Sequence, residues 1–136
     1  MKTVKFLKMG MELELNGEQL NHRFRGYIKN KENEVLFIEI SPFQISKYSS
    51  KELINKFGIG SYAFHICYAF RIEFQDSCCD PKYSKLQKNA DTTATFQNIT
   101  NFINKSFNCD YDNFELIDWM NGKYNYNEIM EELKVA

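Results

Sequence analysis

The sequence has no apolar run approaching the ~18 residues that a membrane-spanning helix needs. Its first residues also lack the apolar segment and the small-residue cleavage site of a secretory signal. We therefore expect a cytoplasmic protein that makes no membrane contact and keeps its four cysteines reduced.

The chain also lacks an excess of charge of either sign, because its formal net charge is −1. Proteins that bind duplex nucleic acid usually carry a clear basic surface, so we expect no duplex binding here. The 136 residues contain no internal repeat and no Pro/Gly/Ser-rich linker. A single domain spanning residues 1–136 is the prediction.

Residues 61–76 contain the most regular pattern in the chain, a strict alternation of large apolar side chains with small or polar ones. Successive side chains of a β-strand point to opposite faces, so this alternation predicts a strand, the longest of the protein. Its apolar face comprises Tyr62, Phe64, Ile66, Tyr68, Phe70, Ile72 and Phe74. That face needs a large apolar cover.

Two further strands are predicted near residues 4–15 and 20–29, paired antiparallel around Asn16-Gly17, because this dipeptide favours a two-residue hairpin turn. A third, at 35–40 (VLFIEI), is apolar on both faces and should be central. Pro42 should limit its extension, because proline cannot donate to the ladder.

A helix is predicted near residues 49–58. Ser49 and Glu52 have the spacing of a capping box, and Tyr48 could pack on Leu53 as a hydrophobic staple. Gly58 supplies a stop. We expect the apolar side of this helix to pack against the sheet.

A second helix is predicted near residues 91–107, starting at Asp91. It carries apolar side chains at spacings of three and four, so it can lie across a sheet. These are Phe96, Ile99, Phe102, Ile103 and Phe107. This helix is the expected cover for the long strand.

Residues 112–126 allow two interpretations. Phe114 to Met120 could form a strand leading into a hairpin, or Asp112 and Glu115 could cap a short helix, which we favour. A terminal helix should follow from Asn125. The predicted fold class is α+β: an N-terminal antiparallel sheet of about four strands, packed by helices near 49–58 and 91–107 and by a C-terminal helical segment.

The arginines suggest one candidate site. Arg23, Arg25 and Tyr27 should project from one face of a strand, and Arg71 could join them. Closely spaced guanidinium groups can bind a carboxylate or phosphate, which allows an anionic ligand or a nucleotide. Ion pairing with Glu12, Glu14 or Glu73 across the sheet explains the same residues and is the favoured interpretation.

The cysteines suggest a second candidate site, at Cys78 and Cys79, with Cys109 as a further ligand. Metal sites usually separate their cysteines by two to four residues, whereas adjacent side chains point apart. We therefore favour inert thiols and expect no metal and no cofactor.

A third candidate site lies on the other face of the long strand, where small side chains invite the close approach of a target or of a second subunit in a homodimer. Its residues are Ala63, His65, Cys67 and Ala69.

No catalytic triad, carboxylate pair or cofactor loop stands out, so we expect no enzyme. The leading hypothesis is a small non-catalytic protein that acts by protein–protein contact. Its profile is that of an inhibitor, an immunity protein or an anti-defence factor of a phage, mobile element or toxin–immunity locus.

Overall fold

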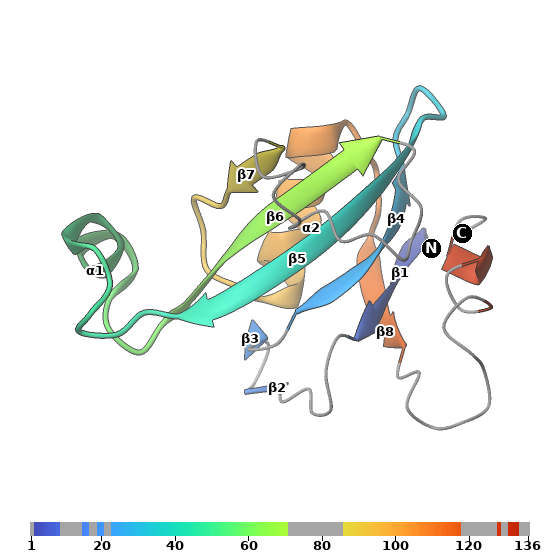
Figure 1. Ribbon diagram of the computed structural model, residues 1–136. Coiled ribbons are helices and arrows are strands. Elements are labelled where there is room, and N and C mark those ends of the chain that lie inside the picture. The colour runs from blue at the N-terminus through green and yellow to red at the C-terminus, as the bar shows by residue number, and fades with distance from the viewer. Residues whose placement is uncertain are drawn as a thin grey trace.

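The computed structural model describes residues 2–8, 15–16, 19–20, 23–70, 86–117, 128 and 131–133. Within them the chain forms a six-stranded sheet in the order β7-β6-β5-β4-β1-β8 (Figure 1). The strands are β1 (Thr3–Lys8), β4 (Phe24–Lys29), β5 (Val35–Gln44), β6 (Tyr62–Phe70), β7 (Gln87–Asn89) and β8 (Asn113–Ile117). A separate pair comprises β2 (Leu15–Asn16) and β3 (Gln19–Leu20), and the helices are α1 (Lys51–Phe57) and α2 (Phe96–Phe107).

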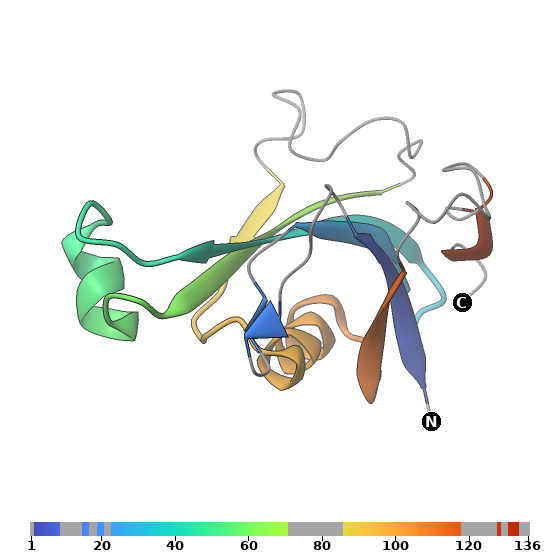
Figure 2. The same ribbon diagram turned by 90° about the horizontal axis from the view of Figure 1, so that it is seen from below.

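The sheet is mixed rather than purely antiparallel. Strands β1, β4, β5, β6 and β7 pair antiparallel in chain order, and β8 then lies parallel to β1. Parallel neighbouring strands need a long connection between them, and α2 lies within the connection from β1 to β8. Figure 2 shows α2 on one face of the sheet. The α+β class is consistent with this arrangement. However, the expected count of about four strands and the N-terminal position of the sheet are inexact, because the described sheet has six strands and two of them, β7 and β8, flank α2 late in the chain.

Strand β6 confirms the alternation seen in the sequence as far as the structure describes it. The apolar side chains of Phe64 and Tyr68 face α2. The Phe64 ring lies edge-on to Phe102 at 5.4 Å between centroids, and Tyr68 lies 5.1 Å from Phe107. The prediction that this helix covers the strand is therefore confirmed. Residues 71–76 of the predicted strand lie outside the described residues.

Strand β5 is central, as predicted, and is buried from Leu36 to Pro42. It does not stop before Pro42. The N–H of Ile45 points toward β6, because it donates to the carbonyl of Ser61. Backbone N–H groups point to alternate sides along a strand, so the nitrogen of Pro42, three residues earlier, points away from β6. On that side β4 pairs only as far as Ile40, and a missing donor costs the ladder nothing there.

The N-terminal strands pair largely as predicted. Strands β1 and β4 are antiparallel, with Phe6 opposite Gly26. The short pair β2–β3 sets Asn16 opposite Gln19, which places the chain reversal one residue later than the Asn16-Gly17 turn that we expected.

Helix α2 begins later than predicted. Thr95, rather than Asp91, caps it, with its hydroxyl accepting from the N–H of Asn98 at 3.1 Å. The helix ends at Phe107 as expected, and Asn108 adopts the left-handed conformation with φ of 57°.

The favoured helix at 112–126 is wrong where the structure describes it, because residues 113–117 form β8. Pairing with β1 uses a strand edge that β4 leaves open. Phe114 then packs against the rings of Phe6, Phe24 and Phe96. Residues 118–127 lie outside the described residues. Residues 131–133 are helical, and Leu133 is buried on the sheet face opposite α2.

None of the helices in the described ranges has the length and apolar character needed to cross a bilayer.

Candidate functional site

The most distinctive feature of the molecule is an arm formed by residues 41–65. Its base consists of the ends of β5 and β6, which pair from Ser41↔His65 to Gln44↔Tyr62, beyond the last residue of β5 that pairs with β4. The arm carries α1 at its tip, which Figures 1 and 2 show projecting past the rest of the sheet.

Local hydrogen bonds define the start of α1. The hydroxyl of Ser50 accepts from the N–H of Leu53 at 3.3 Å, so the cap lies one residue later than the predicted Ser49. Ser49 instead accepts from the N–H of Ser46 at 3.0 Å. The predicted staple is not formed, because the side chain of Tyr48 is 85% exposed.

Two glycines return the chain from α1 to β6. Gly58 ends the helix, as predicted, and donates to the carbonyl of Ile54 at 2.9 Å. Gly58 and Gly60 have φ of 88° and 92°, values that side-chain-bearing residues rarely adopt. Ser61 then donates its hydroxyl to the carbonyl of Phe57 at 2.6 Å. These contacts fix α1 relative to the two strands of the arm.

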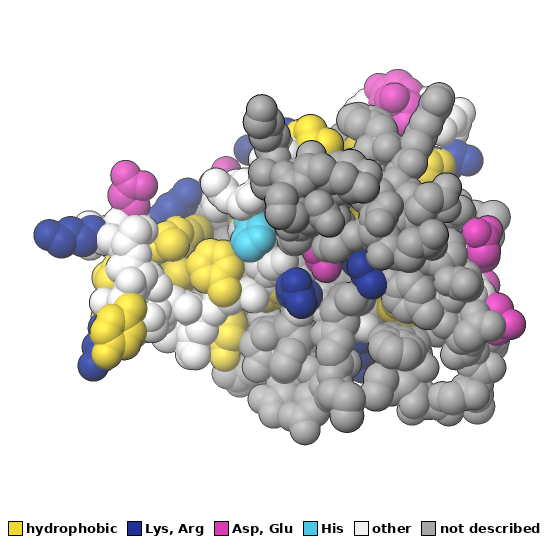
Figure 3. Space-filling model, viewed as in Figure 1, with side chains coloured by type: hydrophobic (Ala, Val, Ile, Leu, Met, Phe, Trp, Pro, Cys, Tyr) yellow, Lys and Arg dark blue, Asp and Glu magenta, His cyan; other side chains and the backbone are white. Residues whose placement is uncertain are grey.

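Helix α1 does not pack against the sheet as we expected. None of its residues is buried, and Leu53, Ile54 and Phe57 are only half-buried. The reason is topological: α1 lies within the loop of the β5–β6 hairpin, beyond the end of β4. The side chains of Tyr48 and Ile59, which flank the helix, are 85% and 63% exposed. Figure 3 shows apolar side chains at this end of the molecule.

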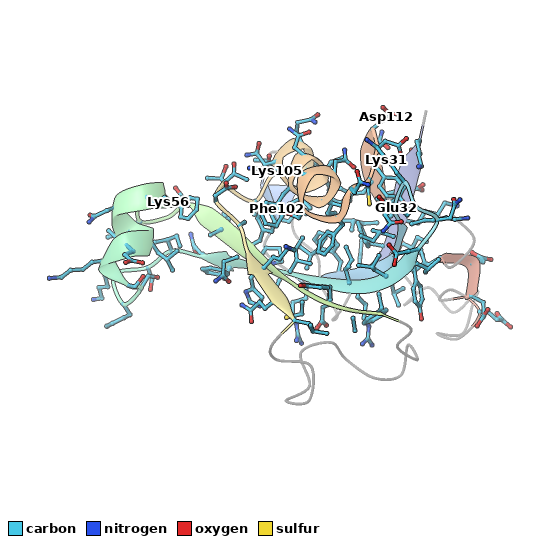
Figure 4. The ribbon with its side chains drawn as sticks, turned by 90° about the horizontal axis from the view of Figure 1, so that it is seen from above. Lys31, Glu32, Lys56, Phe102, Lys105 and Asp112 are labelled. Carbon is cyan, nitrogen blue, oxygen red and sulfur yellow. The ribbon has the colours of Figure 1, made fainter. Side chains whose placement is uncertain are left out.

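A pocket of about 370 Å³ lies between α1 and the sheet. Its apolar lining comes from Phe43, Leu53, Phe57, Ala63, Phe64 and Ala90, and its polar lining comes from Glu52, Lys56, His65 and Asn89. Figure 4 shows the Lys56 side chain directed from α1 toward the sheet.

The wall of the pocket opposite α1 is fixed by backbone hydrogen bonds. His65 pairs with Asn89 of β7, and the N–H of Ala90 donates to the carbonyl of Phe64 at 3.1 Å. The ring of Phe43 lies 6.1 Å from the imidazole of His65. The pocket therefore combines an apolar floor with charged groups of both signs.

The arm differs in charge from the rest of the chain. Lys47, Lys51 and Lys56 against Glu52 give residues 41–65 a formal charge of 3 − 1 = +2. The whole chain carries −1, so the remaining residues carry −1 − 2 = −3. All four charged side chains of the arm are exposed, which leaves them available to a partner.

The arginine candidate site is not assembled as a ligand site in the described residues. Tyr27 is buried and packs edge-on against Phe37 at 5.4 Å. Arg25 is half-buried and stands directly opposite Glu39, which is only 1% exposed. The glutamates that we expected as ion-pair partners, Glu12, Glu14 and Glu73, lie outside the described residues. Arg23 is exposed just before β4, and Arg71 lies outside the described residues.

The small-residue candidate site is mostly internal. Cys67 and Ala69 are buried in an apolar cluster with Leu7, Tyr27, Phe37 and Leu133. Ala63 is also buried and lines the arm pocket, where half-buried His65 joins it. Close approach therefore occurs within this chain, and the accessible remainder of the predicted interface is the pocket itself.

The cysteine candidate site is described only at Cys109, since Cys78 and Cys79 lie outside the described residues. Cys109 is buried, its thiol contacts the carbonyl of Phe107 at 3.7 Å, and burial raises the pKa of the thiol to about 11. A metal ligand has to be a thiolate, which this environment disfavours. Within the described ranges, no group of three or more His, Cys, Asp or Glu residues could hold a metal ion.

Comparison of the chain with protein-family models, curated sequences and solved structures found no significant match. The arm and its pocket are therefore the features of this chain that bear on its function. The sequence contained one usable signal for the arm, because apolar Tyr48 and Ile59 lie just outside the caps of α1. It contained none for the pocket, whose lining comes from positions 43 to 90 and converges only in the fold.

Proposed function

We propose that this protein is a small non-catalytic binding protein that acts by protein–protein contact, and that the tip of the arm is its contact surface. The observation that carries the proposal is the exposure of Tyr48 and Ile59 at 85% and 63% on a projecting element. Exposed apolar groups that cluster on one surface are typical of protein-interaction sites.

The composition of the arm supports the same conclusion. Aromatic residues are enriched at protein interfaces because they bury a large area at a small cost in conformational entropy. Tyr48 presents its ring to solvent, while half-buried Leu53, Ile54 and Phe57 extend the apolar surface. The glycine return and the strand pairing hold these groups in a fixed arrangement, which reduces the entropy lost on binding.

The proposal is tested by capture of partners from source cells with the full chain as bait. We expect a partner that the wild type retains and that the double variant Tyr48→Ser/Ile59→Ser loses. Both side chains are exposed, so the variant should fold normally. The retained protein is then purified, and its affinity for both baits is measured by titration calorimetry.

A matched control is Val35→Ser, which removes another exposed apolar side chain (37% exposed) at the start of β5, outside the arm. This variant should retain the partner. Equal recovery with the wild type and with the double arm variant would overturn the proposal, as would equal losses with the arm and control variants.

A narrower form of the proposal is that binding inhibits or neutralises the partner, as an inhibitor, immunity protein or anti-defence factor would. Surface complementarity without catalytic residues is sufficient for that role. An activity assay of the purified partner decides it: inhibition by the wild type, relieved in the double arm variant, is the expected result.

A further inference from the structure

We infer that the pocket beneath α1 receives one bulky apolar side chain from an acidic segment of the partner protein. This inference rests on the proposed function and adds the chemistry of the partner to it. Tyr48 and Ile59 would then contact the surface of the partner, while the pocket takes an anchoring side chain. Such central anchors usually carry a large share of the binding energy of an interface.

The size and lining of the pocket determine the kind of anchor. Its volume of about 370 Å³ lies near the lower end of the range for ligand pockets, about 300–1,000 Å³, and suits a single large side chain. Phe43, Leu53 and Phe57 supply apolar contacts, and Ala63 leaves space at the floor because its side chain is small. An aromatic ring would gain both apolar burial and ring contacts there.

The charge of the arm determines the surroundings of that anchor. The arm carries a formal charge of +2, and Lys56 lies on the pocket wall itself. Acidic groups beside the anchor would be attracted to Lys56 and to Lys47 and Lys51 at the same tip. Among the described residues that line the pocket, Glu52 is the one acidic side chain, and it lies on the same wall as Lys56.

Single-stranded nucleic acid is the competing occupant, because lysines beside an exposed tyrosine could also hold phosphates and stack a base. A nucleic-acid strand is held by many phosphate contacts along a basic groove, whereas the arm offers three lysines and the lining of the pocket is mainly apolar. These observations favour an acidic protein segment over a nucleic acid.

The test is a titration of the ¹⁵N-labelled full chain, followed by NMR, with capped tripeptides as probes. The probes are Glu-Trp-Glu, Lys-Trp-Lys and Glu-Ala-Glu, and a short oligothymidine strand serves as the nucleic-acid probe. We expect Glu-Trp-Glu to bind most tightly, with the largest shifts at the amides of Ala63, His65 and Asn89. Glu-Ala-Glu should leave these amides unchanged.

Matched charge variants separate pocket contact from general attraction. Lys56→Glu and Lys51→Glu change the charge of the arm equally, but only Lys56 lines the pocket. Lys56→Glu should weaken Glu-Trp-Glu by about fivefold, since a single charge contact contributes up to about 1 kcal/mol. Lys51→Glu should have a smaller effect. Leu53→Asp should abolish binding of both tryptophan peptides, with the dispersion of the spectrum confirming that the variant is folded.

Three results would overturn the inference: no shifts at the pocket with Glu-Trp-Glu, equal effects of the two charge variants, or tighter binding of oligothymidine. None of these affects the capture experiment with Tyr48 and Ile59, so the proposed function could stand while the inference fails. Conversely, peptide binding at the pocket with partner capture unchanged by the arm variants would retain the pocket and reject the proposed contact surface.

Discussion

Replacing Phe114 by alanine tests the assignment of residues 113–117 to a strand at the sheet edge. The Phe114 side chain is 8% exposed, and its ring lies 4.8 Å from that of Phe96, 5.4 Å from Phe24 and 5.7 Å from Phe6. Truncating a buried phenylalanine usually costs about 3–5 kcal/mol. β8 is an edge strand of the described sheet and can relax, so we expect about 3 kcal/mol.

The assay is urea unfolding of the full chain, which gives the free energy of unfolding of each variant. Equal slopes of free energy against urea show that the variants unfold in the same way. Leu116→Ala is the first control, because Leu116 lies on the same face of β8 but is half-buried, and should cost about half as much. Glu115→Ala is the second: its side chain is exposed, and its effect should lie within about 0.5 kcal/mol of zero.

The expected loss is large relative to the total stability of a small domain, which is about 5–15 kcal/mol. A cost for Phe114→Ala no greater than that for Leu116→Ala would refute the packing argument. A large cost for Glu115→Ala would refute the orientation of β8, since it would show that the opposite face of the segment is buried.

Three further predictions concern backbone packing, helix capping and pH. Gly26→Ala should destabilise the fold by about 1–3 kcal/mol in thermal unfolding, because an added Cβ would lie 2.8 Å from the carbonyl oxygen of Lys5 and 2.9 Å from a ring carbon of Phe6. Thr95→Ala should cost about 1 kcal/mol in urea unfolding, because it removes the N-cap of α2. Burial raises the pKa of the Cys109 thiol from 9.0 to about 11, so the folded state retains this proton where the unfolded chain has lost it. Stability measured against pH should therefore fall between those values, and Cys109→Ala should reduce that slope; an unchanged slope would contradict the burial argument.

Local patterns in the sequence predicted the elements whose periodicity matches their environment. The alternation around Phe64 and Tyr68 identified β6 because one face of that strand meets α2 and the other does not. The apolar spacing from Phe96 to Phe107 identified α2 for the same reason. Gly58 marked the end of α1 because few other residues adopt its backbone conformation.

The errors arose where non-local pairing decided the outcome. Asp112 and Glu115 have capping-box spacing, yet the edge of β1 was open and residues 113–117 joined it as β8. Pro42 should have ended β5, but it lies where β4 no longer pairs. A capping pattern and a proline each describe one stretch of chain, whereas the partner of a strand is set by the whole sheet.

The candidate site shows the same division. From the sequence we expected His65 and Ala63 on one face of a strand, and the structure places both in the pocket wall. The residues that complete the pocket, such as Lys56 and Asn89, come from α1 and β7, and no pattern in the chain connects them. Tyr27, by contrast, was expected in an anion site and is buried in an apolar cluster.

The sequence by itself determined which segments alternate, which segments carry a helical apolar face and where glycine allows the chain to turn, because these properties depend on neighbouring residues. Only the tertiary structure decided that β8 pairs with β1, that α1 stands off the sheet on an arm and that a pocket forms beneath it. These outcomes depend on the order of strands in the sheet and on where each neighbouring strand ends, which bring together residues far apart in the chain.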